Sequence, residues 1–180
     1  RSTYSRGLSF VKTFAVRVCN LAESPTAPDT IECFVDEDRT IGDTVKSRTL
    51  GGSIECEVPA VSTDGSNLRY FISSDSSITG NYLDAFRIQD CSGLLLVNNP
   101  LDYETFNRYT FVVGVESSSG GVTYVNVIVN VVNVNEPPTL TATTAYFVDE
   151  NSAKGTLVIP TLLSNVADPD NPSSFTVSID

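Results

Sequence analysis

The sequence predicts an all-β chain made of tandem copies of a seven-stranded, immunoglobulin-like Greek-key sandwich. Residues 34–38 (FVDED) return almost unchanged as residues 147–151 (FVDEN), and Glu37 and Glu150 lie 113 positions apart. This period is longer than that of a solenoid repeat and matches a small domain. Within one period, alternating apolar and polar runs are separated by clusters of Gly, Pro, Asn, Asp and Ser, which is the pattern of strands and turns.

Seven strands are expected in one whole copy. They are placed at residues 30–36, 52–60, 67–73, 82–89, 94–98, 108–116 and 122–132. In the last strand the buried face is expected to carry Val125, Val127, Val129 and Val131, and the other face Tyr124, Asn126 and Asn130. The core is expected to include Tyr70, Phe86, Tyr103 and Phe111. About seven short strands in roughly 100 residues are typical of an immunoglobulin-like sandwich.

The repeat boundaries follow from where the copies align. Residues 1–25 are expected to hold the last strand or strands and the linker of a preceding copy, residues 26–138 one complete copy, and residues 139–180 the first part of the next copy. Both terminal copies are then incomplete, and unpaired strand edges favour aggregation. We therefore expect the natural protein to be longer.

Charge and composition exclude several functions. The chain has 11 basic and 22 acidic residues, a formal net charge of −11 and no histidine. Nucleic acid is not an expected partner, because a phosphate backbone is bound by clustered Lys and Arg. Enzymatic activity is not expected, because histidine is the commonest general base and no nucleophile or phosphate-binding motif is present. No apolar run reaches the roughly 18 residues that a membrane span needs.

Four cysteines permit three complete pairings. Cys33 and Cys56 lie on the first and second expected strands and could be neighbours, whereas Cys19 could join Cys91 across two units. Buried free thiols are the alternative.

Acidic residues recur at fixed places in the unit. Glu37 follows the first strand, Asp102 and Glu104 precede the sixth, and Glu136 lies in the closing segment 133–138 (NVNEPP). Asp168 and Asp170 follow the second strand of the next copy. In an antiparallel sandwich the acids of the first copy gather at one pole, facing those of the next. Calcium prefers such oxygen ligands and binds 6 to 8 of them, so a calcium site between units is expected.

In the order of these motifs the chain resembles a cadherin repeat. The resemblance rests on the Val-x-Glu segment, residues 86–94 (FRIQDCSGL), residues 101–104 (LDYE), the Asn-x-Asn-Glu-Pro-Pro linker and the Asp-x-Asp pair. It implies calcium ligation by eight residues: Glu37, Asp102, Glu104, Asn135, Glu136, Pro137, Asp168 and Asp170. Asn135 would contribute its side-chain oxygen and Pro137 its backbone carbonyl.

Two departures from the cadherin pattern imply fewer ions or weaker binding. Asn133 stands where cadherins usually have the first linker aspartate, and Glu136 where many have aspartate. The upstream linker, residues 20–25 (NLAESP), is poorer in acids, and Ser62 takes the position that corresponds to Asp168. A calcium-poor joint is expected there.

Two functions are compatible with these features. One is a calcium-stiffened segment, extracellular or at the cell surface, that acts in adhesion or as a spacer, with a protein partner that is either another adhesion protein or a second copy of the chain. The other is a structural subunit of an extracellular fibre or surface appendage with little calcium dependence.

Overall fold

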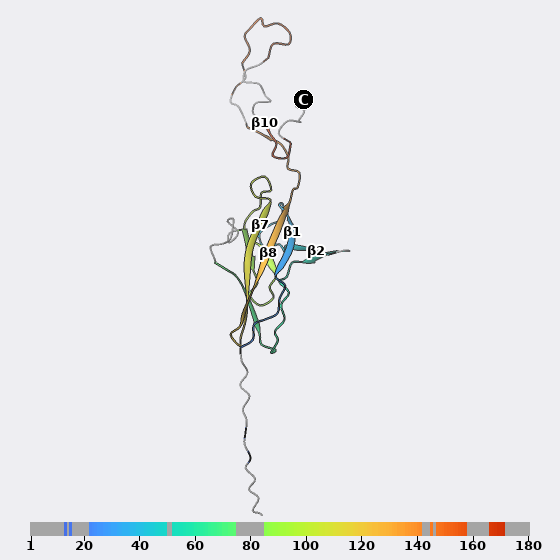
Figure 1. The fold of residues 1–180 in the computed structure, drawn as a ribbon. Coiled ribbons are helices and arrows are strands. Elements are labelled where there is room, and N and C mark those ends of the chain that lie inside the picture. The colour runs from blue at the N-terminus through green and yellow to red at the C-terminus, as the bar shows by residue number, and fades with distance from the viewer. Residues whose placement is uncertain are drawn as a thin grey trace, which may run out of the picture.

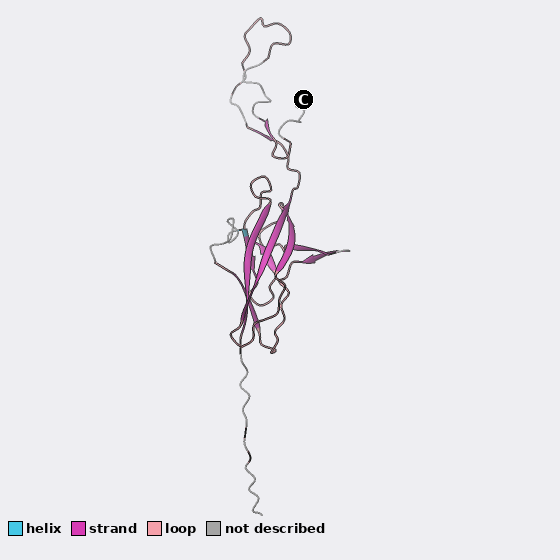
Figure 2. Ribbon diagram, viewed as in Figure 1, coloured by secondary structure: helices cyan, strands magenta, loops and turns pink. Residues whose placement is uncertain are grey.

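A computed structural model describes residues 13, 15, 22–49, 52–74, 85–141, 145, 147–157 and 166–171. The described chain is all-β, so the predicted fold class is confirmed (Figure 2). No helix in these residues has the length and apolar character that crossing a bilayer requires.

A six-stranded sheet forms one layer of the sandwich, in the order β3-β2-β1-β8-β7-β4. The strands are β1 (Thr30–Asp36), β2 (Lys46–Thr49), β3 (Gly52–Glu55), β4 (Leu68–Ile72), β7 (Arg108–Ser117) and β8 (Val122–Val132). β1 runs parallel to β8, while β8 pairs antiparallel with β7 (Figure 1). The start of β8 and the end of β7 therefore define one pole of the sandwich, here the upstream pole. The ends of β1 and β8 define the opposite, downstream pole.

A second layer is built around β5 (Phe86–Ile88) and β6 (Leu95–Val97), which pair antiparallel. Backbone hydrogen bonds extend this layer, because Val45 N–H donates to the Leu95 carbonyl and Leu95 N–H donates to the Cys56 carbonyl. The segments beside β2 and β3 thus cross from one layer to the other. The short strands β9 (Thr139–Leu140) and β10 (Val166–Ala167) pair beyond the downstream pole (Figure 1).

The core fills the space between the layers as the alternation predicts. Val125, Val127, Val129 and Val131 are buried, while Tyr124 is exposed. Phe86 and Phe111 stack with ring centroids 5.9 Å apart. Tyr70 is also buried, and Tyr103 is partly buried against the same core. Contacts between the aromatic ring of Phe86 on β5 and those of Tyr109 and Phe111 on β7 therefore join the two layers.

The expected strands are largely confirmed, with two differences. Strands 30–36 and 122–132 have the predicted bounds. The expected strand 52–60 is shorter, because β3 ends at Glu55 and Cys56 turns into the second layer. β2 was not expected, and part of the expected strand 82–89 lies outside the described residues.

Of the alternatives left open for the cysteines, the Cys33–Cys56 disulfide is present, with the Cα atoms 6.0 Å apart. It joins β1 to the segment that crosses between layers, and both residues are 1% exposed. Cys91 is an exposed free thiol. Cys19 lies outside the described residues, and because Cys91 is unpaired, the possible Cys19–Cys91 bridge is not present.

Candidate metal centre

Glu37 organises the downstream pole. It directly follows β1 and is only 7% exposed. Its two carboxylate oxygens accept backbone N–H groups from Tyr103, at 2.6 Å, and from Val134, at 2.7 Å. A carboxylate that receives two backbone donors is held in one orientation, since an unmade bond would leave a partly buried N–H unsatisfied. Glu37 therefore ties the loop before β7 to the start of the linker.

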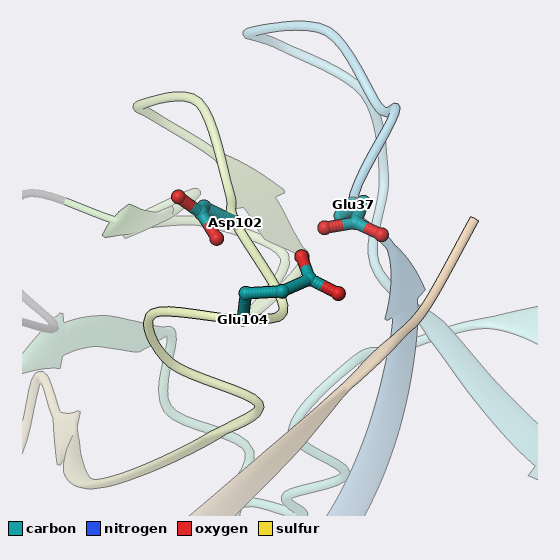
Figure 3. Close-up of side chains that lie close together, drawn as sticks. All are labelled: Glu37, Asp102 and Glu104. Carbon is teal, nitrogen blue, oxygen red and sulfur yellow. The ribbon is translucent and has the colours of Figure 1, made fainter. Parts of the chain in front are cut away.

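Asp102 and Glu104 complete a group of three carboxylates. Asp102 accepts hydrogen bonds from the backbone N–H and the hydroxyl of Thr105, at 2.9 and 2.8 Å, which fix its loop. One carboxylate oxygen from each of Glu37, Asp102 and Glu104 lies within 4.8 Å of the others. Figure 3 shows the Glu104 carboxylate between those of the other two. Three predicted ligands from two distant parts of the chain thus meet.

Asn133 holds Glu104 in this group. The Asn133 amide donates to Glu104 Oε1 at 3.0 Å. An aspartate at position 133 would add a fourth negative charge here, whereas asparagine adds a donor. In the sequence, only the departure from aspartate marks Asn133, and its contact with Glu104 is visible only in the structure.

The linker is bonded to residues 166–171 through Asp170. Glu136 N–H donates to Asp170 Oδ2 at 2.5 Å, and the Thr139 hydroxyl donates to the Ala167 carbonyl at 3.1 Å. Asp168 instead accepts the Asn171 N–H within its own loop, at 2.9 Å, and is not a member of the three-carboxylate group. The Asn135 amide nitrogen donates to the Glu136 carbonyl, at 3.2 Å, which leaves the Asn135 oxygen as the atom suited to a cation.

The electrostatics of Glu136 show that acids from both sides of the linker act at one place. Desolvation raises the pKa of the exposed Glu136 carboxyl, and nearby negative charges raise it further. Those charges belong to Glu37, Glu104, Asp170 and Asp102, in decreasing order of effect. Like charges disfavour ionisation. The salt bridges in the described part of the chain join Arg39 to Asp36 and Lys46 to Glu55, so neither neutralises this group.

The donor set fits calcium. Carboxylate, amide and carbonyl oxygens are the ligands of a hard cation, and nitrogen or sulfur ligands, which softer metals prefer, are missing from the predicted set. The assignment of all eight residues as ligands stays a prediction.

No protein-family model matches the chain. Cadherin-24 of Mus musculus is 28% identical over 186 residues, which cover 95% of this chain and 22% of that protein. Cadherin-99C of Drosophila melanogaster is 31% identical over 107 residues, which cover 57% of this chain and 6% of that protein. The chain thus spans less than a quarter of either relative.

A solved structure of protocadherin gamma B2 extracellular cadherin domains 3 to 6 has the same fold. It superposes with a TM-score of 0.53 at 20% identity and covers 81% of this chain and 30% of that chain. The expected extracellular or cell-surface location is confirmed by this similarity to cadherins, and it agrees with the Cys33–Cys56 disulfide, because disulfides persist in oxidising compartments. The chain has the fold of a cadherin repeat and is similar in sequence to cadherins, as its motifs predicted.

Proposed function

We propose that this chain is a calcium-stiffened extracellular repeat segment that acts in adhesion or as a spacer. Its proposed units are residues 1–25, 26–138 and 139–180, and its proposed role is non-enzymatic. The observation that carries the proposal is the group of three carboxylates, Glu37, Asp102 and Glu104, whose oxygens lie within 4.8 Å of one another. It lies at the pole where the linker begins, and the Glu136 N–H of that linker donates to Asp170 of the proposed following unit.

Calcium would act on the joint by cancelling repulsion. Without a cation, two carboxylates about 5 Å apart repel by about 0.8 kcal/mol in water and by more where solvent is excluded. A divalent ion held between the poles attracts each carboxylate, and these attractions outweigh the repulsion. Proposed carboxylate ligands are Glu37, Asp102, Glu104, Glu136, Asp168 and Asp170, joined by the Asn135 side-chain oxygen and the Pro137 carbonyl. The joint would then resist bending.

Asn133 sets the expected strength of this site. Its amide donates to Glu104, so it supplies no carboxylate where a fully acidic linker would. We propose that the joint binds fewer ions, or binds them more weakly, than such a linker.

The partner of such a segment would be a protein. The similar proteins are cadherins, and we propose that the whole protein contacts either another adhesion protein or a second copy of itself. In this view the repeats described here hold the contact surfaces at a fixed distance.

Calcium titration of a protein that includes the whole following repeat tests the proposal. Calcium is expected to raise the Tm, because a ligand that binds only the folded state stabilises it, and to lengthen the particle in small-angle scattering. Asp170→Asn is expected to weaken both responses. Asp29→Asn, which removes one exposed charge before β1, is the matched control and is expected to leave them intact. No response of the unaltered protein would refute the calcium role and leave the metal-free fibre function.

A further inference from the structure

The upstream linker lies in a seat formed by the turn between β7 and β8. Pro25 is buried, although Ser24 and Thr26 beside it are exposed. A methyl group on Gly121 would overlap the backbone of Glu23 and Ser24, so glycine is required for this close approach. The Thr123 hydroxyl donates to the Pro25 carbonyl at 2.5 Å. The linker backbone therefore touches the repeat directly.

A backbone bridge holds the other side of the linker. Thr26 N–H donates to the Val61 carbonyl at 2.9 Å, and Val61 N–H donates to the Thr26 carbonyl at 2.8 Å. Such a reciprocal pair is one rung of an antiparallel ladder. It fastens the linker to the loop that contains Asp64.

Asp64 organises that loop, and the loop is bonded to the turn between β7 and β8, because the Ser118 N–H donates to the Asn67 carbonyl at 2.9 Å. Asp64 Oδ1 accepts the Ser62 hydroxyl at 2.8 Å and the Ser66 N–H at 2.9 Å. Hydrogen bonds from Ser66, then Ser62, then Ser119 hold the pKa of Asp64 well below its usual range. Ser119 in turn shares a 2.7 Å hydrogen bond with Ser117, which is 2% exposed.

These contacts form a closed circuit. The linker touches Gly121, the turn that contains Gly121 is bonded through Ser118 to Asn67 in the loop of Asp64, and that loop returns to the linker through Val61. We propose that the upstream pole is a metal-independent docking surface for the linker of the preceding unit of the same chain. This inference rests on the proposed tandem organisation but not on calcium binding at the downstream pole.

The two poles use their carboxylates differently. At the downstream pole, neighbouring acids oppose each other and raise the pKa of Glu136. At the upstream pole, neutral serine donors stabilise one ionised carboxylate, and hydrogen bonds to a charged acceptor are about twice as strong as neutral ones. No cation is needed to balance such a network.

Amide hydrogen exchange measures the two poles separately when it is carried out on the full chain, first with calcium and then with a chelator. Thr26 and Val61 amides report on the upstream seat, and the Glu136 amide, which donates to Asp170, reports on the downstream joint. Chelation is expected to change exchange at Thr26 and Val61 by less than twofold. A tenfold or greater acceleration at these two amides would overturn the metal-independent seat. If chelation accelerates exchange at the Glu136 amide alone, both the metal-independent seat and calcium binding at the downstream joint are supported. If exchange stays constant at all three amides, the seat is supported and calcium binding at the downstream joint is refuted.

A pair of matched variants tests the seat itself. Thr123→Val removes the hydroxyl that donates to Pro25 and is expected to accelerate Thr26 exchange about fivefold, with or without calcium, as the loss of one hydrogen bond predicts. Thr110→Val makes the same change on β7, opposite Ile128, and is expected to have no effect on Thr26. Equal behaviour of the two variants would refute the seat.

Discussion

Replacement of Glu37 by glutamine separates two effects that act in opposite directions. The native carboxylate accepts two backbone N–H groups, from Tyr103 and Val134. Glutamine keeps one acceptor oxygen but turns an N–H₂ group towards the other donor. Weakening one charged hydrogen bond and leaving one partly buried donor unsatisfied costs about 2–4 kcal/mol. The same change removes one negative charge from the three-carboxylate group.

The relief of repulsion is smaller than this loss. Two unit charges 4.8 Å apart repel by about 0.9 kcal/mol in water, and Glu37 has two such neighbours. Without calcium, the net destabilisation is therefore expected to be about 0.3–2.3 kcal/mol, which lowers the Tm of a domain of this size by about 1–10 °C. With bound calcium the repulsion is already cancelled and Glu37 is a proposed ligand, so the loss is expected to reach at least the full 2–4 kcal/mol, again as about the cost of the two backbone donors.

Glu104→Gln is the matched control, because Glu104 is exposed and the retained Oε1 can still accept the Asn133 amide. Without calcium it is expected to stabilise the chain slightly, by up to about 1 kcal/mol. Thermal unfolding followed by circular dichroism, with calcium and with a chelator, measures both variants. An unchanged or raised Tm of Glu37→Gln without calcium would refute the structural role derived from its two backbone donors.

Three further predictions concern the disulfide, the other two cysteines and acid stability. Replacing Cys33 and Cys56 by alanine opens a loop with a sequence separation of 23, and denaturant unfolding is expected to show a loss of about 3 kcal/mol; an unchanged midpoint would contradict this. Cys91 is a free thiol in the structure, so peptide mapping without reduction is expected to recover it unpaired, and recovery of Cys91 joined to Cys19 would contradict this. The pKa of Asp64 is lowered in the folded state. Its contribution to stability is therefore fully present above its unfolded pKa of about 3.9, and it is lost as the pH falls through the lower folded pKa. Thr26 exchange, corrected for its intrinsic pH dependence, is therefore expected to remain protected at pH 5, and acceleration between pH 7 and 5 would contradict the assignment.

Strands were predictable where alternation alone decides burial. β8 has the expected bounds because its four valines, at every second position, all lie on the face that packs into the core. β2 was missed because Lys46–Thr49 has no apolar alternation. It forms by adding to β1 through the Cys33–Ser47 and Phe34–Lys46 pairs and by pairing with β3. Its conformation depends on neighbours that are not visible in its own sequence.

The candidate site was also only partly predictable from the sequence. The sequence indicated Glu37, Asp102 and Glu104 from their place after and before strands, and the fold brings them together. It could not indicate that Glu37 is buried and bonded to Tyr103 and Val134, because backbone donors carry no residue-type signal. The sequence-based expectation of a calcium-poor upstream joint stays a prediction, although the structure shows what Asp64 contacts there.

The contrast between the poles follows from what surrounds each carboxylate. Glu37 and Asp64 both accept hydrogen bonds that fix a loop, yet Glu37 has Asp102 and Glu104 beside it and Asp64 has serines. A group of acids without a cation partner destabilises its own fold and gains most from an added divalent ion, whereas a carboxylate surrounded by neutral donors gains little. One repeat can therefore carry a calcium-responsive joint at one end and a constant joint at the other. In a tandem array of this kind, calcium would change the flexibility of selected joints and leave the others as they are.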